Sequence, residues 1–237
     1  MNFDELIGND EVKEILSNAV SNNRVLHSYM FLGTRGIGKY LFAKAFAKKV
    51  LCITDNNPCK ECKSCLEFDN NNHPDYHEIE PIDGSIKIEQ IREITEKVIE
   101  KPIVSNKKIY VIRESDKMTD EAQNCLLKTL EEPPAYLIII LIAENESMML
   151  STIKSRCTKI SFKPIQNNLI LDYLENNYGL TNVSDNILGL FNGSIGNAID
   201  YIDKKEMYEE VEKTFLNIEK NNILDVLNKL DCLYSNK

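Results

Sequence analysis

The feature that most constrains the fold is a glycine-rich turn at residues 33–39, Gly-Thr-Arg-Gly-Ile-Gly-Lys. An apolar run typical of a buried strand precedes it at residues 29–32, and a helical pattern follows it at residues 41–50. In this context the pattern Gly-x-x-x-x-Gly-Lys predicts a phosphate loop, whose backbone N–H groups and helix N-terminus favour an anion. The plainer alternative is a strand-to-helix turn that binds no ligand. The residues that would approach the phosphates are Gly33, Gly36, Gly38 and Lys39.

Two groups that bind Mg²⁺ in hydrolytic phosphate-loop proteins are missing. Such proteins place Ser or Thr directly after the loop lysine, and this chain has Tyr40, whose phenol oxygen lies several ångströms farther from the backbone. They also place an acidic residue at the end of a neighbouring strand, and here Arg113 follows the apolar run at residues 108–112. Glu114 remains where a water-orienting carboxylate would lie. The sequence therefore predicts a loop of inherited geometry that does not hydrolyse ATP, and ATP binding in this chain's own site is doubtful.

Patterns typical of strands and helices alternate over residues 1–163, which predicts an α/β domain with a mostly parallel sheet. After Pro164 the patterns are all helical, so we expect a small helical domain at residues 164–205 and a further helical segment at residues 206–237. The expected strands are 29–32, 108–112 and 137–143; the expected helices are 10–20, 41–50, 91–99, 119–130, 170–178, 183–191 and 195–202.

Four of the seven cysteines crowd into residues 52–65, and they are Cys52, Cys59, Cys62 and Cys65. Four thiolates at such spacings are typical of a closed, tetrahedral Zn²⁺ site with a structural role. Unligated cysteines and an iron–sulfur cluster are the less favoured alternatives, and His73 could replace Cys52 as a ligand. The sequence predicts a zinc-binding insert in an otherwise polar, asparagine-rich loop.

Charge and hydropathy exclude several classes of protein. The net charge of −9 disfavours strong DNA binding by this chain alone, because phosphate contacts by basic residues supply most non-specific affinity. No apolar run approaches the ~18 residues of a membrane span, and the first residues lack the pattern of a signal peptide. We therefore expect a cytoplasmic protein with no membrane partner.

Taken together, these motifs resemble those of bacterial clamp-loader AAA+ subunits. The resemblance covers about residues 1–205 and rests on the phosphate loop, the four-cysteine insert and three short runs. The runs are His-Ser-Tyr-Met-Phe-Leu-Gly at 27–33, Leu-Leu-Lys-Thr-Leu-Glu-Glu-Pro-Pro at 126–134, and Ser-Arg-Cys at 155–157. It implies an AAA+ parallel-sheet domain with a zinc-binding insert, a small helical lid, and the beginning of a C-terminal helical collar at residues 206–237.

Within this family, the absence of the two Mg²⁺-binding groups resembles the pattern of delta-prime subunits, because gamma/tau subunits keep the Mg²⁺ hydroxyl and the strand-end aspartate. A third departure is Asn197, at a position where the active relatives carry an arginine that touches the nucleotide. The Ser-Arg-Cys run is kept, and the resemblance implies that Arg156 acts as an arginine finger at the ATP site of a neighbouring subunit. The implied partners are gamma/tau and delta subunits, with the sliding clamp and primer-template DNA reached through the assembled complex of the DNA polymerase III holoenzyme.

Two other functions are weighed beside this one. The chain could be an active AAA+ ATPase of the gamma/tau type, which turnover of Mg²⁺–ATP would reveal. It could also be a zinc-bearing DNA-binding module, which would need a basic face that the net charge of −9 does not favour.

Overall fold

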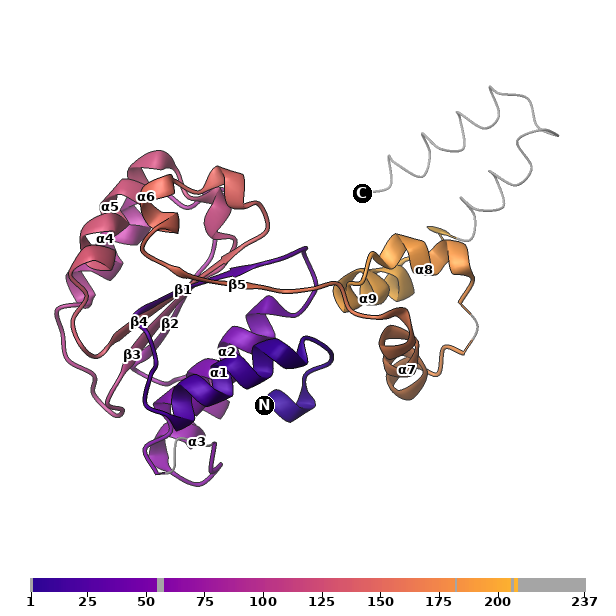
Figure 1. The fold of residues 1–237 in the computed structure, drawn as a ribbon, viewed down its shortest axis with the longest axis horizontal. Coiled ribbons are helices and arrows are strands. Elements are labelled where there is room, and N and C mark those ends of the chain that lie inside the picture. The colour runs from indigo at the N-terminus through magenta and orange to yellow at the C-terminus, as the bar shows by residue number, and fades with distance from the viewer. Residues whose placement is uncertain (1, 55–57, 182, 206, 209–237) are drawn as a thin grey trace.

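The computed structural model describes residues 2–54, 58–181, 183–205 and 207–208, and a parallel sheet lies at its centre (Figure 1). In this part of the chain the sheet has five strands in the order β2-β3-β4-β1-β5, all parallel to their neighbours. The three strands that the sequence predicts are the middle three of the sheet, so the expected α/β fold is confirmed. The strands are β1 (Ser28–Leu32), β2 (Tyr76–Ile79), β3 (Lys108–Ile112), β4 (Leu137–Ala143) and β5 (Thr158–Ser161).

Helices cover both faces of the sheet, with α1 and α2 on one face and α4, α5 and α6 on the other (Figure 1). Successive side chains of a strand point to opposite faces, so Phe31 belongs to the core beneath α1 and α2, and Met30 belongs to the core beneath α4 and α5. The helices are α1 (Asp10–Ser21), α2 (Lys39–Leu51), α3 (Lys63–Asp69), α4 (Ile88–Lys97), α5 (Asp120–Glu131) and α6 (Ser151–Lys154), with short 3-10 helices at Phe3–Glu5, Ser115–Lys117 and Glu146–Met148.

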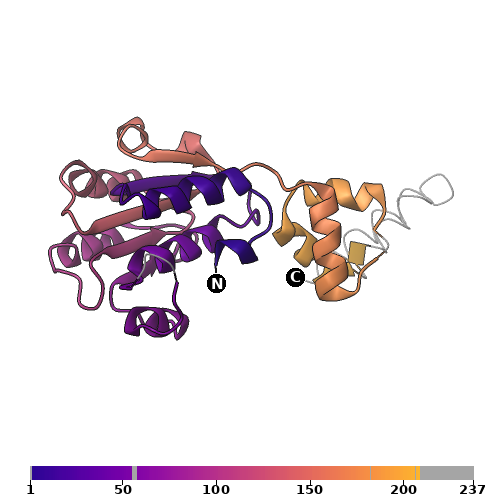
Figure 2. The same cartoon turned by 60° about the horizontal axis from the view of Figure 1, so that its bottom comes forward.

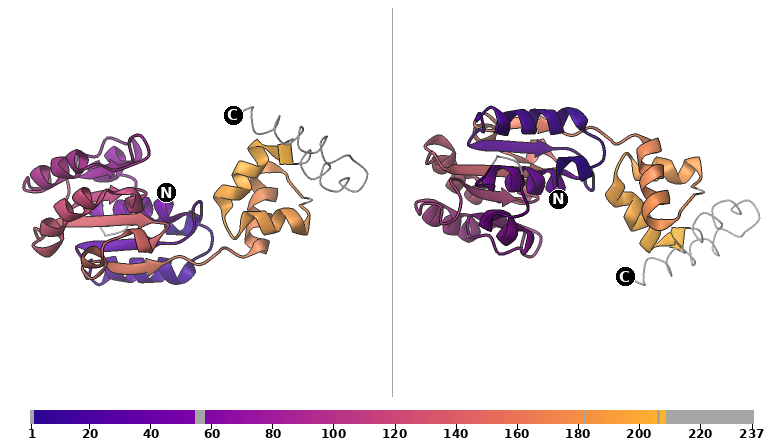
Figure 3. Two further views of the ribbon diagram at one scale, coloured as in Figure 1. Left: turned by 90° about the horizontal axis from the view of Figure 1, so that it is seen from above. Right: turned by 90° about the horizontal axis from the view of Figure 1, so that it is seen from below.

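Three further helices stand beside the sheet and are joined to it by the extended segment after β5 (Figures 2 and 3). They are α7 (Asn167–Tyr178), α8 (Asp185–Phe191) and α9 (Ile195–Asp203). Phe162 and Ile165 of the connecting segment share one apolar cluster with Phe191 and Tyr201, so these helices pack against the end of the main core. We call α7–α9 the helical group.

The predicted start of a collar at residues 206–237 lies outside the described residues, apart from residues 207 and 208. None of the helices in the described part is long and apolar enough to cross a membrane.

Candidate functional site

The phosphate-loop residues lie between β1 and α2, where the sequence places them, and they touch the helical group. Gly36 and Gly38 have φ angles of 71° and 100°, which favour glycine. The N–H of Gly196, at the start of α9, donates to the carbonyl of Gly36 at 2.9 Å. A Cβ atom built on Gly36 would lie 2.9 Å from the Cα of Gly196 and 2.4 Å from Ser194 Oγ. The helical group therefore rests directly on the loop through a glycine–glycine contact.

Lys39, the first residue of α2, is folded back onto its own loop. Its ammonium donates to the carbonyls of Gly33 and Thr34, the latter at 2.8 Å, and the residue is only 7% exposed. Burial lowers the pKa of Lys39, while the carboxylates of Glu144 and Asp116 act in the opposite direction. The ammonium that the sequence predicts to reach phosphates therefore already has two hydrogen-bond acceptors within its own loop.

Tyr40 and Arg113, the two residues at the expected Mg²⁺ positions, are joined in one network. The Tyr40 hydroxyl donates to the carboxylate of Glu78 on β2, with oxygen–oxygen distances of 2.9 and 3.0 Å. The guanidinium of Arg113 lies 4.4 Å from the centre of the Tyr40 ring and pairs with Glu80. Burial and the Glu78 carboxylate raise the pKa of Tyr40 to about 12, so the phenol stays protonated at neutral pH. A neutral hydroxyl and a cation therefore lie at the two positions for which the phosphate-loop pattern predicts oxygen ligands of Mg²⁺.

Two further acidic residues near the loop, Glu114 and Glu144, already have partners within the protein. Glu114 has a positive φ of 47°, and its ion pair with Lys117 lowers the pKa of its carboxyl. Glu144, directly after β4, accepts the backbone N–H of Arg35 at 3.1 Å, so a carboxylate occupies a donor that would face a phosphate. Sequence reasoning missed Glu144; its place directly after a buried strand next to β1 was the available signal.

A cavity of about 490 Å³ lies against the loop. Its lining includes the cationic Lys39 and Arg113 and the more apolar side chains of Leu6, Ile7 and Tyr173. Its volume is within the usual range of ligand pockets, about 300–1,000 Å³. Asn197 also lines it, and its amide donates to the carbonyl of Phe191 at 3.2 Å.

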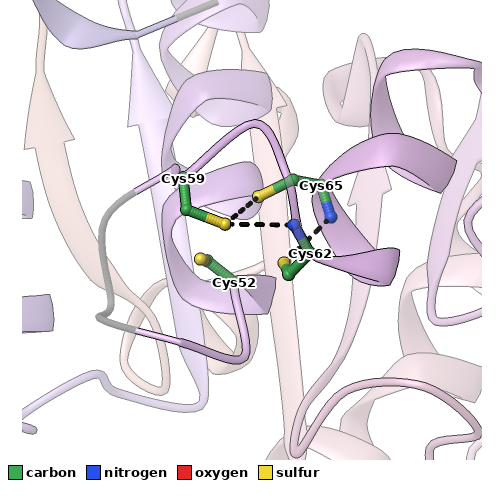
Figure 4. A group of neighbouring side chains, drawn as sticks. All are labelled: Cys52, Cys59, Cys62 and Cys65. Carbon is green, nitrogen blue, oxygen red and sulfur yellow. Dashed lines mark hydrogen bonds between the residues drawn. The ribbon is translucent and has the colours of Figure 1, made fainter.

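The four cysteines converge at the end of α2 and the start of α3 (Figure 4). Their sulfur atoms all lie within 4.8 Å of one another, and the sulfurs of Cys59 and Cys65 are 3.9 Å apart. Tetrahedral Zn²⁺ with Zn–S bonds of ~2.3 Å would place its sulfurs ~3.8 Å apart. The backbone N–H groups of Cys62 and Cys65 point at the sulfurs of Cys59 and Cys62, at 3.3 and 3.4 Å. These four thiols could hold a metal ion.

The thiols differ in their ease of ionisation. Hydrogen bonding from Thr54 and from nearby backbone N–H groups lowers the pKa of Cys59 to about 6, and burial raises the pKa of Cys65 to about 12. His73, weighed above in place of Cys52, is not part of the group: its Nε2 lies 2.9 Å from Ser64 Oγ, and its Nδ1 accepts the N–H of Asp75. Its Ser64 contact ties α3 to the core, because Ser64 Oγ also donates to the carbonyl of Leu51 at the end of α2.

Arg156 lies just after α6 on the far side of the sheet from α1 and α2. Its guanidinium pairs with Glu131 at 2.7 Å and donates to the carbonyl of Thr152 at 2.8 Å. Its carbonyl accepts the hydroxyl of Ser28, at the start of β1, at 2.6 Å. About one third of the side chain is exposed, so the guanidinium is held yet accessible.

The sheet order, the glycine-rich loop after β1 and the adjoining helical group define an AAA+-type α/β fold. Solved structures agree on the fold. A DNA polymerase III gamma subunit-related protein from Thermotoga maritima matches with a TM-score of 0.51 at 20% identity, over 85% of this chain and 61% of that one. The RuvB Holliday junction branch migration motor of Thermotoga maritima matches with a TM-score of 0.54 at 16% identity, over 98% of this chain and 71% of that one.

Sequence comparisons show the family. The family described as DNA polymerase III, delta subunit, matches residues 8–166. The delta' subunit of Bacillus subtilis DNA polymerase III is 38% identical over 69% of this chain and 50% of that protein. The gamma/tau subunit of Mycoplasma genitalium is 31% identical over 95% of this chain and 39% of that protein. The chain belongs to the delta'/gamma/tau family of DNA polymerase III clamp-loader subunits, and it spans half or less of the length of these two curated relatives.

Proposed function

We propose that this chain is a clamp-loader subunit of the delta-prime kind, which does not hydrolyse ATP at its own phosphate loop. The observation that carries the proposal is the network of Tyr40, Arg113 and Glu78 at the expected Mg²⁺ position. The self-bonded Lys39 and the Glu144 carboxylate on the loop amide support it, because each takes the place of a phosphate contact.

In this function the chain acts on a neighbouring subunit. Arg156 would donate to the γ-phosphate of ATP bound by a gamma/tau neighbour and neutralise the charge that develops during phosphoryl transfer. Such arginine fingers are worth about 10³–10⁵ in rate in well-studied systems. The partners would be gamma/tau and delta subunits, with the sliding clamp and primer-template DNA engaged by the assembled complex. The helical group would act as the lid, in a unit of residues 164–205 that follows an α/β domain of residues 1–163, with a collar beginning near residue 206.

The four cysteines would hold one structural Zn²⁺. Sulfur positions that match a tetrahedral site, and backbone N–H groups aimed at two of the sulfurs, support this choice of metal. A bound cation favours the thiolate form of every ligand, including the buried Cys65. The ion would tie the insert to the ends of α2 and α3.

The testing experiment is steady-state ATPase of the chain alone and mixed with a gamma-type partner and primed DNA. We expect no Mg²⁺-dependent turnover from the chain alone and full turnover from the mixture. Turnover by the isolated chain that Lys39→Ala abolishes would refute the proposal and favour an active gamma/tau-type ATPase. In the assembled complex, Arg156→Ala should lower both ATPase and clamp loading, though other subunits keep their own fingers.

A further inference from the structure

The guanidinium of Arg156 is held by a carboxylate that lies twenty-five positions earlier in the chain. Glu131 Oε1 lies 2.7 Å from Arg156 Nη2, and Glu131 is the last residue of α5. Pro133 and Pro134 follow after Glu132 and prevent the helix from continuing, so the carboxylate stands at a fixed helix end. An arginine finger needs no carboxylate partner within its own subunit, so the Glu131 contact calls for a separate role.

Both members of the pair stand on anchored backbone. Leu130, next to Glu131, and Cys157, next to Arg156, are buried in the same apolar cluster, together with Ile153 of α6. The Ser28 hydroxyl fixes the backbone carbonyl of Arg156 to the start of β1. The distance between the two side chains is therefore set by the core and not by a mobile loop.

The pair contributes little to stability. Both side chains are substantially exposed, 34% for Arg156 and 48% for Glu131, and exposed ion pairs of this kind stabilise a fold only slightly. Its effect is on orientation instead. An arginine side chain has many rotamers, and part of this conformational freedom is lost whenever the guanidinium is fixed on a ligand. Fixing it beforehand removes that loss from the encounter with phosphate.

We infer that Glu131 is a positioning residue for Arg156, an inference that rests on the proposed finger function. The Glu131 carboxylate forms an ion pair with Nη2, and the carbonyl of Thr152 accepts an N–H of Nη1. A guanidinium has five N–H groups, so donors remain for the phosphate oxygens of a nucleotide on the adjoining subunit. Glu131 directs the finger, and it touches neither nucleotide nor phosphate.

The test uses the full-length protein assembled into the clamp loader, with sliding clamp and primed DNA, and measures kcat and KM for ATP. Glu131→Ala should lower kcat at least about threefold with little change in KM, because misdirected reacting groups slow the chemical step. Glu131→Gln should recover most of this loss, since its carboxamide has the shape of the carboxylate and places an oxygen against Nη2. Glu132→Ala is the matched control: Glu132 is exposed, and its side chain makes no ion pair among the described residues.

A double-mutant cycle separates this inference from the finger function. In an Arg156→Ala background, Glu131→Ala should have no further effect on kcat, because the group that it directs is absent. If Arg156→Ala lowers kcat but Glu131→Ala leaves it unchanged or raises it, or if Glu131→Gln gives no recovery, Glu131 does not position the finger. If Arg156→Ala itself leaves kcat and clamp loading at wild-type rates, the finger function fails and this inference fails with it.

Discussion

The contact between Gly196 and Gly36 makes a quantitative prediction about the helical group. A Cβ atom added to Gly196 would lie 2.6 Å from the Cα of Gly36 and 3.2 Å from its carbonyl oxygen, both backbone atoms that cannot rotate away. Forcing a methyl group into such a site typically costs about 1–3 kcal/mol. Gly196→Ala should therefore push α9 away from the phosphate loop and lower the free energy of unfolding.

Gly189→Ala is the matched control, because Gly189 lies in α8 and a Cβ atom there meets nothing within 4 Å. Both substitutions gain the same helix propensity, about 0.5–1 kcal/mol, so their difference isolates the contact. We expect Gly196→Ala to be less stable than Gly189→Ala by about 1–3 kcal/mol. At about 2–4 °C per kcal/mol for a chain of this size, their Tm values should differ by roughly 2–12 °C.

The assay is thermal and denaturant unfolding of the two variants and the wild type, with circular dichroism as the readout. Equal Tm values for Gly196→Ala and Gly189→Ala would refute the reasoning, because the helical group could then not rest on the loop through these two glycines. A Tm lowered by the same amount in both variants would point to a general intolerance of substitution in the helical group and would also refute the reasoning.

Three further predictions concern the cysteine cluster and the buried carboxylate of Asp75. We expect metal analysis of chelator-free protein to give about one equivalent of zinc. Cys62→Ser should abolish it, and Cys125→Ser, outside the cluster, should leave it unchanged; equal zinc in both variants would contradict the assignment. Acidification should release zinc from the wild-type protein, because the cysteine ligands must be thiolates. Zinc content that is unchanged down to pH 4 would argue against thiolate ligands. Asp75→Asn should cost at least about 3 kcal/mol in unfolding free energy, because its buried carboxylate accepts three backbone N–H groups at 2.6–2.8 Å. The exposed Asp83→Asn is its control, and an equally small effect of both would show that this carboxylate is dispensable.

The sequence predicted the centre of the sheet better than its edges. The strands β1, β3 and β4 are buried along their whole length, so apolar runs were visible. The edge strands β2 and β5 were missed: β2 reads Tyr-His-Glu-Ile and is half-exposed, and β5 reads Thr-Lys-Ile-Ser with only Ile160 buried. An edge strand has a neighbour on one side only, so polar side chains are tolerated there and the apolar signal is lost.

For the candidate site, local patterns indicated which residues matter but not what they touch. The loop glycines, Lys39 and the cysteines follow from short spacings, because one turn of chain sets their geometry. The partner of Tyr40 is Glu78, thirty-eight positions away, and the carboxylate at the Arg35 amide is Glu144, more than one hundred positions away. Such pairs depend on the order of strands in the sheet, which a single sequence does not specify.

These tertiary contacts also explain why restoring two residues should not restore hydrolysis. Tyr40→Thr with Arg113→Asp supplies the missing hydroxyl and carboxylate, but it removes one of the two hydroxyl donors to Glu78 and the ion-pair partner of Glu80. Several carboxylates would then crowd the position intended for Mg²⁺ and triphosphate, and like charges disfavour a bound polyanion.

Three other obstacles survive the double substitution. Lys39 stays bonded to its own loop, Glu144 still occupies the amide of Arg35, and Asn197 still supplies no cation to the cavity. We therefore expect less than about one hundredth of the ~1–10³ s⁻¹ usual for enzymes from the double variant, measured as phosphate release with Mg²⁺. Adding Glu144→Ala and Asn197→Arg should raise it, because these changes free a loop amide and supply a cation. Turnover in the usual range from the double variant alone, abolished by Lys39→Ala, would refute this expectation. It would show that Tyr40 and Arg113 alone prevent ATP hydrolysis and that the contacts around them do not.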